Sequence, residues 1–223
     1  TIKTRVIGNN QHLLRIDEEE ETAINALLED ELINRVHKII SSGVDAIILE
    51  DYNKGLLTEN AIGKITQLAI EANIPVTVDP KKENFFAYQN VTLFKPNLKE
   101  LKEGLGVDFE ISQDKSGFES AVVELENRLN NQITLVTLSE NGVFVKKDKE
   151  SNYIAAHIRK ISDVSGAGDT VIAVATLCLV AGLSPSELAD VANLSGGLVC
   201  EISGVVPIDR QLLYNELLKL MTA

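Results

Sequence analysis

The sequence is poor in the residues and runs that mark secreted or membrane-spanning proteins. It has no tryptophan, one methionine and two cysteines among 223 residues. Cys178 and Cys200 both lie in apolar stretches, so we expect reduced core residues and no disulfide framework. No apolar run is long enough to span a membrane and we recognise no signal peptide, so the expected location is the cytoplasm.

Positive charge is also scarce. The chain has 21 lysines and arginines against 33 aspartates and glutamates, which gives a net charge of −12. This balance argues against nucleic acid or an anionic membrane as the main partner, although a single site can still be positive enough for a phosphorylated substrate. Hydrophobic residues make up 44% of the chain, which is enough for a folded domain with a substantial core.

Two further absences concern motifs and the start of the chain. The sequence contains no Gly-x-x-x-x-Gly-Lys-Ser/Thr, which excludes a P-loop enzyme. The chain begins at Thr1 without an initiator methionine, so we expect a fragment or a part of a longer chain.

Short apolar runs alternate with patterns that are typical of amphipathic helices. Strands are predicted at residues 44–49, 74–78, 92–94, 132–138, 142–146 and 153–157. Helices are predicted before Gly43, from Thr58, from Asn97, and at residues 116–130, 169–181, 185–202 and 209–221. This alternation predicts an α/β fold, with a doubly wound, mostly parallel sheet and helices on both faces.

The first 21 residues have a different pattern. Residues 3–17 contain two short apolar runs around a turn-like triplet at residues 8–10, which predicts two short strands. The five acids at residues 17–21 are interpreted as the solvated start of a helix, since acids are favoured at a helix N-terminus.

The most informative stretch is Asp163–Thr170, Asp-Val-Ser-Gly-Ala-Gly-Asp-Thr, which directly precedes an apolar run with helical character. A glycine-rich turn that opens a helix binds anions, because unpaired N–H groups and the helix dipole face the ligand. Gly166 and Gly168 let the backbone approach that ligand closely. Asp169 is either a helix cap or a base that takes a proton from a hydroxyl attacking a phosphoryl group.

Two other places combine polar groups that can bind a ligand. Asn97 and Glu100 face the same way on one helix turn, where they can hold hydrated Mg²⁺ near phosphates. The alternative is a helix N-cap with a capping-box acid. Thr137, Ser139 and Gly142 supply hydroxyls and N–H groups between two predicted strands, or form a plain hairpin turn.

Charged side chains near the N-terminus suit a sugar phosphate. On alternating strands Arg5 falls among short apolar residues, where a long cation needs an anionic partner. The alternative is edge-strand charge that opposes aggregation. Asp51, Tyr52 and Lys54 follow a predicted strand, at the sheet edge where open α/β proteins bind ligands.

The stretch at residues 163–170 resembles the second signature of the PfkB/ribokinase family of sugar kinases. It matches that signature at Asp163, Val164, Gly166, Ala167, Gly168, Asp169 and Ala173. It departs at Val174, where the family usually has a small residue. The resemblance implies a ribokinase-like fold that uses ATP and Mg²⁺, with Asp169 as the catalytic base. It places the anion hole at the amides of Gly166, Ala167 and Gly168.

The same resemblance implies further ligand contacts. It assigns the nucleotide and its Mg²⁺ to Lys81, Asn97, Glu100, Thr137, Ser139, Gly142 and Asn193. For Asn193 the alternative of a surface helix residue is equally good. The family often uses a monovalent cation such as K⁺, here at backbone carbonyls around Asp163 and Ser165.

The N-terminal polar residues are similar to those of the D-glycero-β-D-manno-heptose 7-phosphate kinases, the kinase half of bifunctional ADP-heptose synthases. The motifs Asp51-Tyr52-x-Lys54-Gly55 and Val78-Asp79-Pro80-Lys81 look like the same subfamily. Substrate contacts are then implied at Arg5, Asn10, Gln11, Arg15, Asp51, Tyr52 and Lys54. Glu50 and Asn9 depart from the subfamily, which usually has Ser and often Arg at these positions.

The resemblance extends from about Lys3 to the end of the chain. It implies one kinase domain over residues 1–223 without the family's first strands and Gly-Gly sugar motif, with residues 3–17 as lid strands of a homodimer. The implied reaction is ATP-dependent phosphorylation of the anomeric hydroxyl of heptose 7-phosphate, for lipopolysaccharide core synthesis. The alternatives are a kinase for another acceptor, such as a fructose phosphate or nucleoside, and a nucleotide-binding module without turnover.

Overall fold

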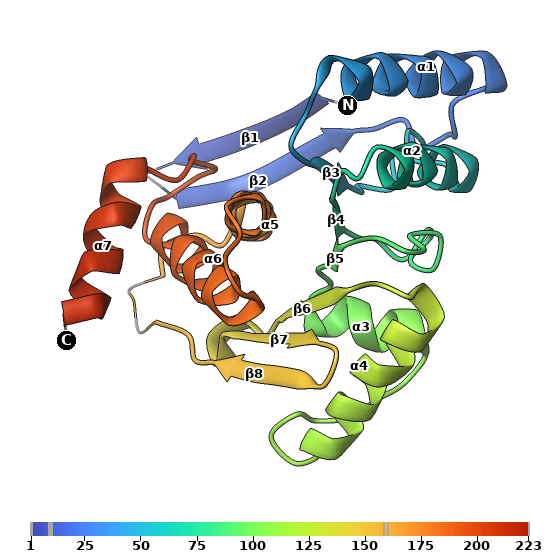
Figure 1. Ribbon diagram of the computed structural model, residues 1–223. Coiled ribbons are helices and arrows are strands. Elements are labelled where there is room, and N and C mark those ends of the chain that lie inside the picture. The colour runs from blue at the N-terminus through green and yellow to red at the C-terminus, as the bar shows by residue number, and fades with distance from the viewer. Residues whose placement is uncertain (1, 9–10, 158, 160, 223) are drawn as a thin grey trace.

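The computed structural model describes residues 2–8, 11–157, 159 and 161–222. A six-stranded sheet runs through the molecule in the order β3-β4-β5-β6-β7-β8 (Figure 1). Its strands are β3 (Ile47–Glu50), β4 (Val76–Asp79), β5 (Leu93–Phe94), β6 (Ile133–Thr137), β7 (Val143–Lys147) and β8 (Glu150–Ile154). β3 to β6 are parallel, and β7 and β8 add to them as antiparallel strands. The predicted α/β class with a mostly parallel sheet is confirmed.

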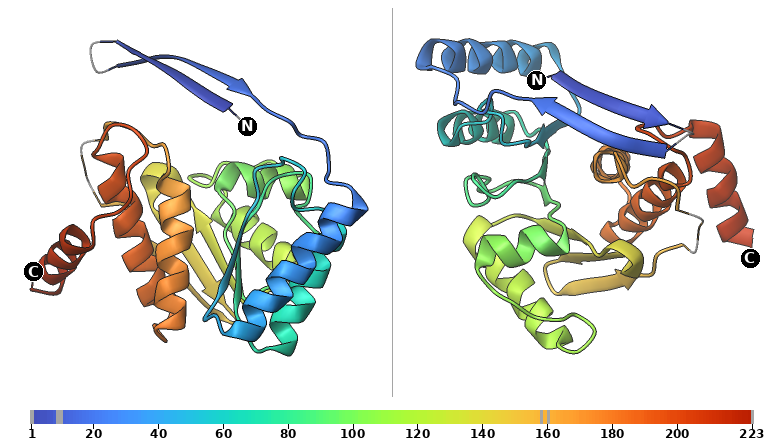
Figure 2. Two further views of the ribbon diagram at one scale, coloured as in Figure 1. Left: turned by 90° about the horizontal axis from the view of Figure 1, so that it is seen from above. Right: turned by 180° about the vertical axis from the view of Figure 1, so that it is seen from behind.

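Helices cover both faces of this sheet (Figure 2). One face carries α2 (Glu59–Glu71), α3 (Leu98–Leu105) and α4 (Lys115–Leu129). The other carries α5 (Ala167–Val180) and α6 (Pro185–Cys200), which pack against each other along their lengths. The parallel strands therefore have an apolar layer on each side, as their nearly continuous apolar sequences require.

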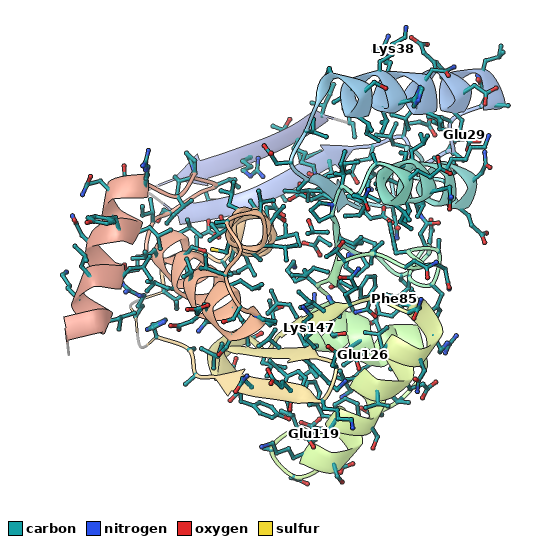
Figure 3. All side chains as sticks on the ribbon, in the orientation of Figure 1. Glu29, Lys38, Phe85, Glu119, Glu126 and Lys147 are labelled. Carbon is teal, nitrogen blue, oxygen red and sulfur yellow. The ribbon has the colours of Figure 1, made fainter. Side chains whose placement is uncertain are left out.

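Each face has its own apolar core, because successive strand residues point to opposite sides of the sheet. Phe94 belongs to the core under α2, α3 and α4, whereas Leu93 belongs to the core under α5 and α6. The first core is rich in aromatic rings: Phe118 packs edge-on against Phe144 at 5.0 Å between centroids, and Phe85 against Phe94 at 5.2 Å. Phe85, labelled in Figure 3, is almost completely buried.

The N-terminal region is built differently. β1 (Ile2–Gly8) and β2 (Gln11–Glu18) pair as an isolated antiparallel hairpin, and α1 (Ala26–Ser42) follows. The hairpin projects from the sheet as a separate arm (Figure 2). No residue of α1 is buried, and its predicted apolar face is largely open, with Leu27 82% exposed. Glu29 and Lys38 on α1 lie at the periphery of the molecule (Figure 3).

The predicted elements differ from the structure mainly at their ends. The acids at residues 17–21 do not start a helix: Asp17 and Glu18 end β2, and α1 begins only after the N-cap Asn25. The last predicted strand extended to residue 157, but β8 ends at Ile154. The final helix, α7, spans Arg210–Thr222. No helix in the described part of the chain is long and apolar enough to cross a membrane.

Candidate active site

The N-terminus of α5 forms the centre of the site. Gly166 caps the helix at φ +81°, a left-handed conformation that favours glycine, and no side chain caps the first turn. The N–H groups of Gly168 and Asp169 therefore have no protein acceptor among the described residues. These groups and the helix dipole are suited to an anion, and the anion hole predicted at this turn stays a prediction. Of its three predicted amides, that of Ala167 donates to the carbonyl oxygen of Val164 at 3.3 Å.

Asp169, in the first turn of α5, is exposed and faces the loop after β3. Burial raises the pKa of the Tyr52 hydroxyl, and the Asp169 carboxylate, to which it is hydrogen-bonded, raises it further. Burial also raises the pKa of Glu50, with an added effect from the nearby carboxylates of Asp169 and Asp79. Asp169 is thus an exposed carboxylate that lies close to the Tyr52 hydroxyl.

A buried ion pair lies beneath the glycine turn. Lys95, 2% exposed, places its Nζ 3.0 Å from Oδ2 of Asp79, which is 8% exposed. A Cβ added to Gly168 would lie 3.6 Å from that Asp79 oxygen and 3.7 Å from the Lys95 nitrogen. The second glycine of the turn therefore lies directly over the pair, at the carboxyl ends of β4 and β5.

A cavity of about 290 Å³ opens beside Tyr52. It is lined by Lys3, Glu19, Glu50, Asp51, Tyr52, Lys54, Leu56 and Leu57. Lys3 reaches it from β1, and Lys54 from the loop after β3, so the arm and the sheet both contribute a cation. A cavity with several convergent charged groups beside a free carboxylate fits a small polar acceptor.

Asp51, unlike the predicted substrate residues Tyr52 and Lys54, is buried, with an exposed fraction of 4%. Its carboxylate is hydrogen-bonded to other groups of the protein. Its Oδ1 accepts from the backbone N–H of Asn53 at 2.8 Å. Its Oδ2 accepts from the Tyr88 hydroxyl at 2.7 Å and from the Asn84 amide at 3.2 Å. In this structure Asp51 holds the loop that carries Tyr52 and Lys54.

The predicted nucleotide residues gather at the start of α3. Asn97 and Glu100 form a reciprocal capping box, in which each side chain accepts from the other residue's backbone N–H at 2.8 Å. Lys81 forms an ion pair with the same glutamate. Burial lowers the pKa of Lys81, but the contact with Glu100 outweighs this and raises it above its ordinary value. The capping box is therefore present, and it does not exclude a contact with hydrated Mg²⁺, since the capping oxygens keep free lone pairs.

The turn after β6 lies beside this motif. Thr137 forms a parallel bridge with Asn97. Ser139 and Asn97 both line a second cavity of about 790 Å³ that extends along α3. Gly142, at φ +88°, cannot be replaced without a clash, because a Cβ would lie 2.0 Å from the carbonyl oxygen of Ile154. The atoms around Gly142 belong to the protein's own backbone, at Ile154, Ala155 and Ala156.

The oxygen donors near α3 fit a hydrated magnesium ion better than a directly bound one. Among the residues that the structure describes, no group of three or more His, Cys, Asp or Glu side chains could hold a metal. Mg²⁺ bound with a nucleotide keeps several waters and takes only one or two protein ligands. Asn97 and Glu100 suit contacts to those waters.

Three predicted residues have structural partners in the fold. The Asn193 amide donates to the carbonyl oxygen of Ala155 at 2.9 Å, which fixes the segment after β8. Asp163 accepts from the backbone N–H of Ser165 at 2.9 Å and from that of Gly204 at 3.0 Å. These contacts shape the loop that leads into α5.

The hairpin brings only part of its predicted polar set to the cavity. Arg5 lies on β1 with its side chain exposed, and does not line the cavity. Asn10 lies outside the described residues. Gln11 and Arg15 lie on β2, but their side chains are outside the described part of the structure.

Sequence reasoning gave no role in the site to four charged residues, Lys3, Glu19, Asp79 and Lys95, although Lys3 and Asp79 belong to stretches that resemble the subfamily. Asp79 ends a predicted strand, so the strand-end rule was the available signal. Glu19 was hidden in an acidic run, and Lys95 in a short strand–helix connection. Their partners are distant in the sequence, so spacing alone gave no signal for them.

A family model and a curated relative both match most of this chain. The family model described as pfkB family carbohydrate kinase matches residues 52–210. The bifunctional protein HldE of Methylobacillus flagellatus is 35% identical over 215 residues, which cover 96% of this chain but 43% of that protein. The chain therefore spans less than half the length of this curated relative.

Solved structures show the same fold. Phosphofructokinase-2 from Escherichia coli in complex with potassium superposes with a TM-score of 0.83 at 19% identity, covering 98% of this chain and 70% of that one. Ribokinase of Arabidopsis thaliana complexed with ribose and ATP gives 0.66 at 19% identity, covering 83% and 58%.

Proposed function

The chain belongs to the pfkB family of carbohydrate kinases, and we propose that it phosphorylates the anomeric hydroxyl of D-glycero-β-D-manno-heptose 7-phosphate with ATP. The product is the 1,7-bisphosphate, a precursor of ADP-heptose for the lipopolysaccharide core. One observation carries the proposal: Asp169 stands in the first turn of a helix that has no side-chain cap, close to Tyr52 of a cavity lined by two lysines. The alternative acceptors are other sugars or sugar phosphates, and the weaker alternative is nucleotide binding without turnover.

In the proposed reaction Asp169 takes the proton from the attacking hydroxyl, which contributes about 10²–10⁴ in rate for a well-placed base. The backbone N–H groups of Gly166, Gly168 and Asp169 stabilise the charge on the transferring phosphoryl group in this proposal, and that of Ala167 can join them only by leaving the carbonyl oxygen of Val164. Each such donor is worth about 10²–10³ in rate. Tyr52, hydrogen-bonded to Asp169, orients the carboxylate towards the acceptor.

The acceptor lies in the cavity between β1 and the loop after β3 in this proposal, with Lys3 and Lys54 near its phosphate. Arg5, Asn10, Gln11 and Arg15 of the hairpin remain proposed contacts, and Asp51 acts through the loop that it holds. ATP lies along the edge from Lys81 and Asn97 to the turn with Thr137, Ser139 and Gly142, and Asn193 stands near the adenosine. Mg²⁺ bound near Asn97 and Glu100 would neutralise charge on the phosphates.

Three further parts of the proposal concern K⁺, assembly and location. A monovalent cation is proposed at the loop of Asp163 and Ser165. The hairpin is proposed to act as a lid that pairs with a second copy of the chain, because its residues Val6, Leu13, Leu14 and Ile16 are 44–65% exposed. The proposed location is the cytoplasm, where ATP is available.

The test is ADP release from ATP and Mg²⁺ in the presence of heptose 7-phosphate or fructose 6-phosphate. Wild type is compared with Asp169→Asn and with the matched control Asp148→Asn, which lies in the turn between β7 and β8. We expect release that depends on heptose 7-phosphate, that falls about 10²–10⁴-fold in Asp169→Asn, and that persists in Asp148→Asn.

Each other result removes one part of the proposal. Release with fructose 6-phosphate alone would retain the kinase and exclude the heptose. ATP binding without release would favour the nucleotide-binding module. Equal activity in wild type and Asp169→Asn would exclude this carboxylate as the base.

A further inference from the structure

The two lysines of the acceptor cavity share one counter-ion. Lys3 on β1 places its Nζ 3.1 Å from Oε1 of Glu19, and Lys54 forms an ion pair with the other oxygen of the same carboxylate. The Glu19 side chain is only 16% exposed, whereas those of Lys3 and Lys54 are 37% and 26% exposed. One carboxylate thus bridges two cations that come from opposite sides of the cavity.

This arrangement is the one that a bound phosphate would require. Two ammonium groups converge on one anion, and each oxygen of the anion meets a different lysine. The contacts with both lysines hold the pKa of Glu19 below its usual range, so the carboxylate is charged at neutral pH. A phosphate that enters the cavity must therefore compete with Glu19 for the same nitrogen atoms.

The backbone next to Glu19 does not need to move for such an exchange. The segment between β2 and α1 is fixed to the loop after β3, because Ile24 donates its backbone N–H to the carbonyl oxygen of Gly55 at 2.9 Å. The two backbones touch here: a Cβ on Gly55 would lie 2.0 Å from the carbonyl oxygen of Thr22. A rotation of the Glu19 side chain is enough to uncover both lysines.

Glu21 gives the released lysine a second partner. Its Oε1 lies 2.5 Å from Nζ of Lys54, but its side chain is 67% exposed and does not line the cavity. Asp17 stands in the same relation to Lys3, at 3.9 Å. The two cations therefore keep a charged neighbour outside the cavity when Glu19 leaves.

We propose that Lys3 and Lys54 form a phosphate subsite whose place Glu19 occupies in the free protein, so that the acceptor's phosphate exchanges with this carboxylate. The inference rests on the proposed function only in placing a phosphorylated acceptor in this cavity. It makes Glu19 a specificity-determining residue, because a sugar without a phosphate leaves the Glu19 bridge intact. A sugar phosphate gains two cations at the cost of that bridge.

Binding of inorganic phosphate tests the subsite without sugar or ATP. Titration calorimetry at constant ionic strength compares wild type with Glu19→Gln and with Glu18→Gln. Glu18 is the matched control, because this neighbouring carboxylate at the end of β2 is exposed and does not line the cavity. We expect Glu19→Gln to bind phosphate about three- to tenfold more tightly, as the loss of two partly exposed competing ion pairs implies. Glu18→Gln should bind like wild type.

A second variant locates the effect. The anion site at the start of α5 also attracts phosphate, so Lys54→Met is added to Glu19→Gln, and the gain in affinity should disappear. If the gain survives in the double variant, or if Glu19→Gln binds phosphate no better than wild type, the proposal is overturned. Weaker binding by Glu19→Gln would mean that the carboxylate holds the lysines in place instead of competing.

Kinetics then separate this inference from the heptose assignment. With whichever phosphorylated sugar supports turnover, Glu19→Gln should lower KM about three- to tenfold at constant kcat, the same factor as for phosphate. An unphosphorylated sugar should show no such change. If Glu19→Gln does not fold, Glu19→Asp, which keeps the charge and shortens the reach, should shift phosphate affinity in the same direction. The calorimetric experiment uses inorganic phosphate, so it tests the role of Glu19 even if heptose 7-phosphate proves not to be the acceptor.

Discussion

The sheet body, residues 47–200, and the N-terminal region, residues 2–42, are held by different forces. The body buries two apolar cores and a Lys95–Asp79 ion pair, and core side chains such as Phe94 and Phe118 have no contact with solvent. In the N-terminal region α1 buries no residue, and the hairpin meets the body through ion pairs such as Lys3–Glu19–Lys54. The candidate site lies where the two meet, with Asp169 on the sheet body and Lys3 of the arm in the cavity wall.

Charge should matter far more in the body than in the N-terminal region. Lys95→Met leaves Asp79 buried without its partner and should lower the free energy of unfolding by about 3–5 kcal/mol. Arg35→Met on α1 breaks a pair with Glu31 whose side chains are 72% and 53% exposed, and should change it by less than about 1 kcal/mol. Urea unfolding of both variants measures the difference. Equal losses of stability in the two variants would contradict the expected difference between the sheet body and the N-terminal region.

Removal of apolar side chains should show the same asymmetry. Phe118 is completely buried among Phe109, Phe144 and Tyr153, so Phe118→Ala should destabilise the protein by about 3–5 kcal/mol. Leu27→Ala, at a side chain 82% exposed, should stay within about 0.5 kcal/mol. A loss above about 2 kcal/mol for Leu27→Ala, on the scale of a buried side chain, would mean that another surface covers α1 in solution.

The glycine turn should be sensitive to a single methyl group. Gly166→Ala forces a left-handed conformation on alanine, which costs about 1–2 kcal/mol, and its Cβ would lie 3.2 Å from Val205. The matched control is Gly63→Ala on α2, where a Cβ meets nothing within 4 Å. That change should stabilise the helix by about 0.5–1 kcal/mol. Thermal unfolding distinguishes the two by the sign of the shift.

The smallest change in stability is expected from the ion pairs of Glu216 on α7. Contacts with Lys219 and Arg159 lower the pKa of Glu216 to about 2. A depressed carboxyl pKa stabilises the folded state fully above the unfolded value of 4.5 and loses that contribution as pH falls towards 2. Wild type should therefore exceed Glu216→Gln in stability at pH 6, and the difference should shrink towards zero near pH 2. A difference that does not depend on pH would exclude this ion pair as its cause.

Sequence patterns predicted local structure well, because local structure depends on neighbouring residues. Gly43 ends α1, and Gly166 and Gly168 open α5, as their positions in the sequence indicate. The patterns could not show what lies opposite an apolar face: the residues that mark one face of α1 are correctly placed on a helix, yet Leu27 and Ile39 face solvent.

The site was predictable to the extent that its residues belong to one motif. The turn at Asp163–Thr170 and the pair Asn97 and Glu100 follow from short spacings. The Glu19 bridge does not, because its partners are 16 and 35 residues away in the sequence and meet it only after the arm has folded over the loop. The end of β8 was also mispredicted because of a distant partner: the Asn193 amide on α6 donates a hydrogen bond to the carbonyl oxygen of Ala155.

The order of the strands in the sheet is also their order along the chain. A ribosome therefore delivers each strand next to the edge on which it will pair, so the sheet can grow during translation without waiting for later segments. One face is an exception, because α5 and α6, which cover it, are synthesised only after all six strands. Until then Leu93, Ile133 and Leu135 of that face are uncovered. The nascent chain therefore exposes this apolar face until residues 167–200 have been synthesised.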